Sequence, residues 1–178
     1  EQQELALKSP FTVLDLAGAT KQLAAYNFEA EELVDVSRRM ADISAALGVP
    51  MERLTYNLGQ IRAQTVLTAR DARDFANAGL SITTELAKMY TEQEERIVSV
   101  GDVMDRMSNK MVSFTDVMKV LNRYTDEGGM FYDFQAKQAE TLAGQLSNLT
   151  DAYDFMLNEI GKENQGMLTG SISLVRSL

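Results

Sequence analysis

The sequence predicts an all-α fold, a bundle of about six to eight helices joined by short connections. Apolar residues recur at steps of three and four along almost the whole chain, which is the spacing of one helix face. Alternation of apolar and polar residues over more than four positions is rare, and the Asn-Gly and Asp-Gly pairs typical of hairpins are absent. Only 2 prolines and no long Gly/Ser tract occur, so no obvious linker divides the chain.

Composition narrows the classes of function. Apolar residues make up 45% and charged residues 24% of the 178 positions, which is typical of an ordered domain. The absence of cysteine and histidine excludes disulfides and disfavours zinc or copper sites, and no cofactor is expected. The net charge of −9 disfavours direct nucleic acid binding. No apolar run approaches the roughly 18 residues of a membrane helix, so no membrane segment is expected.

The sequence of the N-terminal third of the chain predicts three helices. Ser9-Pro10-Phe11 is expected to open the first, which runs to about Tyr26 and ends in the corner Asn27-Phe28. Gly48 stands at the usual left-handed stop of the second, and Pro50 suits the first turn of the third. The apolar stripes of the second and third helices are Leu33, Val36, Met40, Ile43 and Leu47, and then Met51, Leu54, Leu58, Ile61 and Thr65.

The middle of the chain predicts two shorter helices. Thr68, with Asp71 three residues later, is typical of a capped start and predicts a helix through Phe75. Asn77-Ala78-Gly79 is expected to end that helix. The next helix covers roughly residues 82–90, and the charged segment 91–96 after it is expected to be exposed.

Further helices follow on both sides of a Gly128-Gly129 break. Ser113 or Thr115 is expected to cap one of them, Gly129 to take a positive φ with Gly128 as the fallback, and Phe131 to dock into the bundle. The longest helix is predicted at about 141–160. The stripes are Val100, Met104, Met107 and Met111; Phe114, Val117, Met118, Leu121 and Tyr124; and Leu142, Leu146, Leu149, Tyr153, Met156 and Ile160.

Residues 124–161 contain the most informative motif. A Gly-Gly pair is followed by an aromatic residue, then by T-x-x-G-x-x-S-N-L, then by an acidic and aromatic helix that ends in Ile-Gly. This pattern resembles the signature segment of the phage and prophage tail tape measure family. The residues that carry the resemblance are Gly128, Gly129, Phe131, Thr141, Gly144, Ser147, Asn148, Leu149, Asp151, Ile160 and Gly161.

The resemblance extends from about Pro10 to Gly161, and its weaker fragments occur in the family's order. Besides Pro10-Phe11 they are Ala41-Asp42-Ile43, Leu47-Gly48-Val49, Glu52-Arg53-Leu54, Ala78-Gly79-Leu80, Glu85-Leu86-Ala87 and Ser113-Phe114-Thr115-Asp116-Val117. The domain organisation expected from this match is a truncated incoming segment at 1–9, a helical tape measure module at 10–162 and the truncated start of a following segment at 163–178.

The resemblance implies a structural and not an enzymatic role. Tape measure proteins are long helical proteins that set tail length in long-tailed phages, occupy the lumen of the tail tube and leave ahead of the DNA at ejection. The module is therefore expected in the virion tail, and in the host bacterial cytoplasm during assembly. Other tail proteins or assembly chaperones would be its partners, and self-association through Phe155 is a further expectation because this residue widens the apolar surface of its helix.

Two alternative functions stay open. A helical protein–protein interaction adaptor unrelated to phage would use a methionine-lined groove, whereas the favoured interpretation places the methionines in the core. A tail-associated hydrolase would need a carboxylate pair, with Glu140 and Asp151 or Asp126 and Glu127 as candidates, but nothing in the sequence provides the apolar setting that raises a pKa.

Other groups of residues that could suggest a binding site have simpler structural explanations. Asp102, Asp105 and Asp116 do not have the spacing of a calcium loop, and helix capping explains Asp102 and Asp116. The two glycines do not follow a strand, so a phosphate-binding loop is not expected. The acidic excess between residues 124 and 160 is interpreted as a solvated face, with a surface for a basic partner as the alternative.

Overall fold

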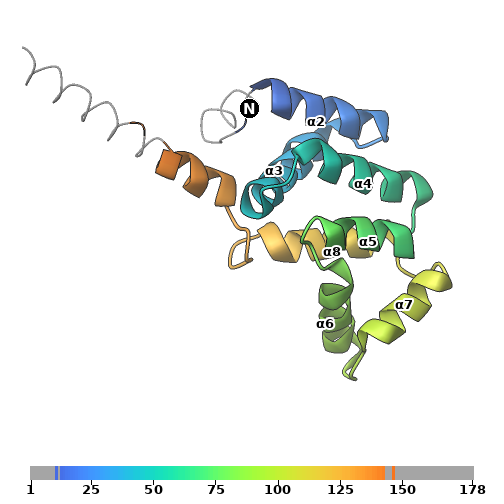
Figure 1. Cartoon of the computed structure of the whole chain (residues 1–178). Helices are drawn as coiled ribbons and strands as arrows, with labels where there is room; N and C mark the ends of the chain where they lie inside the picture. Colours follow the sequence, from blue (N-terminus) through green and yellow to red (C-terminus); the bar gives the residue numbers. More distant parts are fainter. Residues whose placement is uncertain (1–10, 12, 143–145, 147–178) are drawn as a thin grey trace, which may run out of the picture. The chain divides into compact units, whose positions relative to one another are not determined.

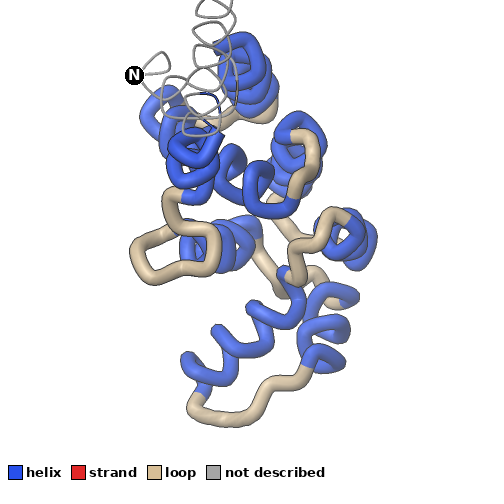
Figure 2. Tube along the Cα trace, turned by 60° about the vertical axis from the view of Figure 1, so that its left-hand side comes forward, coloured by secondary structure: helices blue, strands red, loops and turns tan. Residues whose placement is uncertain are grey.

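The chain is an all-α multi-helix bundle. The computed structural model describes residues 11, 13–142 and 146, and Figure 2 shows helices and loops with no strand in this part of the chain. One isolated bridge joins Val66 to Ser113. The helices are α2 (Val13–Ala25), α3 (Ala30–Leu47), α4 (Met51–Gln64), α5 (Ala69–Asn77), α6 (Ile82–Glu94), α7 (Val100–Ser108) and α8 (Phe114–Thr125), followed by a helix at 134–142 (Figure 1).

The chain divides into two compact units, Glu1–Ala139 and Glu140–Leu178. Within the first unit, two groups of helices share one hydrophobic core. Helices α2, α3 and α4 pack on one another, α6 packs on α7 and α8, and α5 contacts α4, α6 and α7. Helix α8 also packs on α3, so it joins the two groups. The boundaries 10–162 predicted for the module stay a prediction. The largest fully buried side chains include Phe75, Leu23, Met40, Leu54, Leu58 and Ile82.

Local signals start and stop the helices where the sequence predicts. Thr68 and Asp71 form a capping box at the start of α5, and Ser113 with Asp116 forms one at α8, which confirms Ser113 as the cap. Gly48 ends α3 with a φ of 66°, as predicted. Pro50 lies immediately before α4, at its N-cap. Each of these signals works through partners no more than a few residues away.

The stripes predicted for α4 and α7 are wrong in part. Thr65 does not continue the buried face of α4 because it ends the helix with a φ of 64° and is exposed. On α7, Val103 and Met107 face the core, whereas Met104 and the following Met111 are exposed, because only a narrow side of this short helix meets α5 and α6.

Helix α6 is longer than predicted and ends at Glu94. The charged residues after Tyr90 stay helical because they have partners elsewhere in the bundle. Glu92 receives two hydrogen bonds from Arg123 of α8, at 2.7 and 3.0 Å, and Glu94 pairs with Arg106 of α7. Of the segment 91–96 predicted to be exposed, residues 92–96 are exposed and Thr91 is partly buried. None of the described helices has the length and apolar character needed to cross a membrane.

Candidate functional site

A tight turn after α8 contains the glycine pair of the resemblance motif. Gly128 takes the positive φ, 86°, so the prediction that placed it at Gly129 is wrong and the fallback is correct. Gly129 is required for a different reason, namely space. A Cβ atom at Gly129 would lie 2.5 Å from the carbonyl oxygen of Tyr124 and 2.6 Å from that of Arg123. The amide of Phe131 donates a 2.8 Å hydrogen bond to the same Tyr124 oxygen, so the chain folds back against the end of α8.

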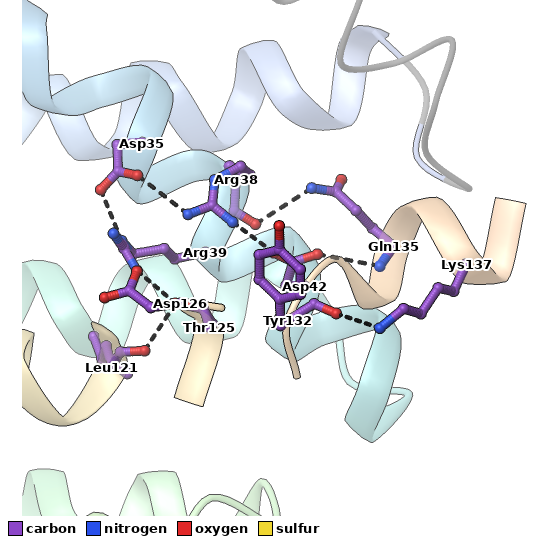
Figure 3. A network of polar contacts seen from close by, with 10 residues as sticks. All are labelled: Asp35, Arg38, Arg39, Asp42, Leu121, Thr125, Asp126, Tyr132, Gln135 and Lys137. Atoms are coloured by element: carbon purple, nitrogen blue, oxygen red, sulfur yellow. Dashed lines mark hydrogen bonds and ion pairs between the residues drawn. The ribbon is translucent and has the colours of Figure 1, made fainter. Parts of the chain in front are cut away.

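Phe131 docks into the bundle, as predicted. Its side chain is buried, and its ring stacks on that of Tyr124 with 5.4 Å between centroids. The amide hydrogen bond to Tyr124 and the ring stack fix both the backbone and the side chain of Phe131 on α8. Residues 134–142 then form a helix, and Gln135 near its start contacts α3 (Figure 3).

Arg39 of α3 makes the first polar connection to this turn. One guanidinium nitrogen, Nη1, lies 2.6 Å from Asp126 Oδ1 and 2.7 Å from Thr125 Oγ1, and Nε donates to Asp35 at 2.7 Å. The Arg39 side chain is only 9% exposed, so its charge depends on these partners. The carboxylates of Asp35 and Asp126 raise the pKa of Arg39 against the opposing effect of burial, and the guanidinium stays charged.

Asp42, one helical turn further along α3, makes the second connection. Its side chain is fully buried; Oδ1 accepts a 3.1 Å hydrogen bond from the backbone amide of Gln135, and Oδ2 lies 3.0 Å from Arg38. Burial raises the pKa of the Asp42 carboxyl, while the Gln135 amide and the Arg38 guanidinium act in the opposite direction. Gln135 is also buried, and its Oε1 has no hydrogen-bond partner.

Together these contacts form a seam between α3 and residues 126–139, which we call the strap. Figure 3 shows the seam, with Arg39 and Asp126 at one end and Asp42 and Gln135 at the other. Sequence reasoning missed it, although Asp42 lies within one fragment of the resemblance. The available signal was the charged pair Arg39 and Asp42, which flank and interrupt the apolar run Met40-Ala41 and Ile43.

The structure describes only some of the remaining residues of the resemblance motif. Gly79 has a φ of 93° in the turn between α5 and α6, where glycine is favoured. Thr141 is exposed. Leu142 and Leu146, which open the predicted stripe of the long helix, are also exposed, so their predicted burial is wrong. Outside the described residues lie Gly144, Ser147, Asn148, Leu149, Tyr153, Phe155, Met156, Ile160 and Gly161.

The methionines do not all lie in the core, as the favoured interpretation expected. Met107 is buried and Met118 is partly buried, but Met104, Met111 and Met130 are 52%, 67% and 76% exposed. The core assignment is therefore wrong for these three. Their exposure supports the alternative of an adaptable apolar surface more than the sequence did.

Asp102, Asp116 and Asp126, three of the carboxylates considered in the sequence, take part in structural contacts. Asp102 and Asp116 accept hydrogen bonds from Ser99 and Ser113 in capping boxes, as predicted. Asp126 pairs with Arg39, and Glu127 is exposed. Within the described part of the chain, no group of three acidic residues is placed to hold a metal ion. An open pocket of about 280 Å³ contains none of these carboxylates; its lining is Phe11, Ser44, Ala45, Gly48, Val49, Pro50 and Gln138.

Comparison with protein family models, with curated proteins and with solved structures found no match. The functional argument therefore depends on the sequence motif and on the geometry of the seam.

Proposed function

We propose that the chain is a structural module of a phage or prophage tail tape measure protein. In this role it contributes to tail length determination, tail assembly and DNA ejection, in the virion tail and, during assembly, in the host bacterial cytoplasm. Other tail proteins or assembly chaperones are its proposed partners. The role is non-enzymatic and involves no cofactor and no direct contact with nucleic acid.

The observation that carries the proposal is the meeting of two distant fragments of the resemblance. Asp42, in the fragment 41–43, binds the backbone of Gln135, 93 positions later and four residues after Phe131 of the glycine-aromatic motif. Gly79, Gly128 and Gly129 serve as turn or close-packing positions. Motif residues that specify turns and helix contacts support an architectural role for the motif.

An in-frame deletion of codons 10–162 in the native phage or prophage tests the proposal. Tails of altered length, or no tails, are expected in negative-stain electron micrographs, because the module belongs to the protein that sets length. In the undeleted phage, mass spectrometry of assembling tails should detect peptides of this chain. Tails of normal length and number after the deletion would contradict the proposal.

A helical interaction adaptor is the second candidate, and the exposed methionines favour it. Met104 and Met111 flank the end of α7, and Ile97 in the preceding loop is 87% exposed. Cross-linking in the native host separates the two candidates. A tape measure module should cross-link to tail proteins, whereas an adaptor unrelated to phage should cross-link to host proteins in a cell without phage genes.

A further inference from the structure

The strap has an unusual attachment for a segment that follows a well-buried helix. Helix α8 is anchored by Val117, Val120 and Leu121, all fully buried. Among residues 126–139, by contrast, Phe131 is the one buried apolar side chain. The polar connection to α3 includes the contacts of Arg39 with Asp126 and of Asp42 with Gln135, and a 3.5 Å hydrogen bond from the Gln135 side chain to the Arg38 carbonyl.

Such a polar seam opens at a small net cost. When the strap leaves α3, water replaces the hydrogen-bond partners of both side chains, so each lost bond changes the free energy far less than its strength in a dry interior. Hydration of the freed ions offsets much of the lost attraction between the charges. The buried Oε1 of Gln135 also gains a partner from water on opening.

The backbone provides a hinge at the right place. Helix α8 ends at Thr125, Asp126 is extended, and Gly128 is exposed with a φ of 86°. A glycine here can change its backbone angles without the penalty that a side chain imposes. The helix at 134–142 begins beyond this hinge, so it can move as one piece while α8 stays in the core.

From this geometry we infer that the strap opens and closes on α3 as a unit, with the turn at residues 126–129 as the hinge, while α2–α8 remain folded. Opening separates Arg39 from Asp126 and Asp42 from Gln135. It also separates the ring of Phe131 from Tyr124. The inference does not depend on the proposed function.

Native-state hydrogen exchange on the complete 178-residue chain tests the inference. The amides of Phe131 and Gln135 report on the strap, because their hydrogen bonds to Tyr124 and Asp42 break on opening, and the amides of Val120 and Leu121 report on α8. Strap amides should exchange at least about tenfold faster than α8 amides, and with a weaker dependence on urea, because a local opening exposes little surface. Equal rates and equal urea dependence in both segments would overturn the inference.

Arg39→Met sharpens the test. It keeps the aliphatic length of the side chain and removes its hydrogen bonds, so the strap amides should exchange about tenfold faster again while those of α4 and α5 hardly change. Arg62→Met is the matched control. Arg62 contacts Phe28, Phe114 and Glu32 and has no contact with the strap, so it should leave the ratio of strap to α8 rates unchanged.

A milder variant covers the case in which Arg39→Met does not fold. Asp126 is 55% exposed, and Asp126→Asn leaves Arg39 bound to Asp35 and Thr125. An increase of about two- to fivefold confined to the strap is expected. Acceleration spread evenly over α8 and the strap, in either variant, would show that the seam supports the whole bundle and would overturn the inference.

Discussion

Arg39 and Asp126 lie 87 positions apart in the chain and 2.6 Å apart in space. Their ion pair ties the middle of α3 to the first residue after α8, and the Thr125 hydroxyl shares the same guanidinium nitrogen. The contact brings the turn that contains Gly128 and Gly129 close to α3.

Arg39→Lys should destabilise the protein by about 1–2 kcal/mol, although the charge is kept. An ammonium group cannot bind Asp35 through one nitrogen while it binds Asp126 and Thr125 through another, as the guanidinium does. Urea unfolding followed by circular dichroism measures the change. Arg53→Lys, at an exposed position of α4, is the control and should change stability by less than about 0.5 kcal/mol.

Alanine substitutions should separate the two adjacent glycines. Gly128→Ala is expected to cost about 1 kcal/mol, because its φ is positive, whereas Gly129→Ala should cost about 2–3 kcal/mol, because the added methyl group meets two backbone carbonyls. Thermal unfolding gives the order. Gly18→Ala, in an open position on α2, should be neutral or stabilising by about 0.5–1 kcal/mol. A larger loss at Gly128 than at Gly129 would contradict the steric argument.

Asp42 should make the protein less stable as the pH rises through its folded-state pKa. Burial raises this pKa above the ordinary value of 3.8, so in that window the unfolded chain has released the Asp42 proton and the folded chain retains it. Asp42→Asn removes this loss. From about pH 4 upward, the unfolding free energy of the wild type should therefore fall relative to that of the variant.

The comparison with the variant is needed because other carboxylates act in the opposite direction. The hydrogen bonds from Arg123 and Arg106 lower the pKa of Glu92 and Glu94, so their contributions are lost as the pH falls. These contributions are the same in both proteins and cancel in the difference. A difference that stays constant with pH would show that Asp42 titrates alike in the folded and unfolded chains.

Ser113→Ala should cost about 1 kcal/mol, because the hydroxyl accepts a hydrogen bond from the Asp116 amide at the start of α8. Guanidinium unfolding followed by fluorescence of the tyrosines measures the loss. Ser108→Ala, at the exposed end of α7, removes a hydroxyl that caps no helix start, and should change stability by less than about 0.5 kcal/mol.

The chain alone should not bind duplex DNA at physiological salt. Its net charge of −9 repels the phosphate backbone. Fluorescence anisotropy with a labelled duplex is the measurement, and a basic DNA-binding protein is the positive control. A sub-micromolar, salt-sensitive association would contradict this expectation.

The sequence by itself determined the fold class and most helix boundaries. Gly48, the Thr68–Asp71 box and the Ser113–Asp116 box act within a few residues, so their effect can be predicted without the rest of the molecule. The stripes of α3 and α4 also have buried centres, because helical spacing alone places those residues on one face.

The tertiary structure decided which charged residues on those helices have ion-pair partners and which apolar residues face solvent. Helix α6 continues to Glu94 because Arg123 and Arg106 come from other helices, and Met104 is exposed because none of the described helices covers that side of α7. Likewise, the Tyr124 carbonyl distinguishes Gly128 from Gly129, and α3 supplies Arg39 and Asp42 to the strap. These outcomes depend on contacts between residues far apart in the chain, which helical periodicity does not encode.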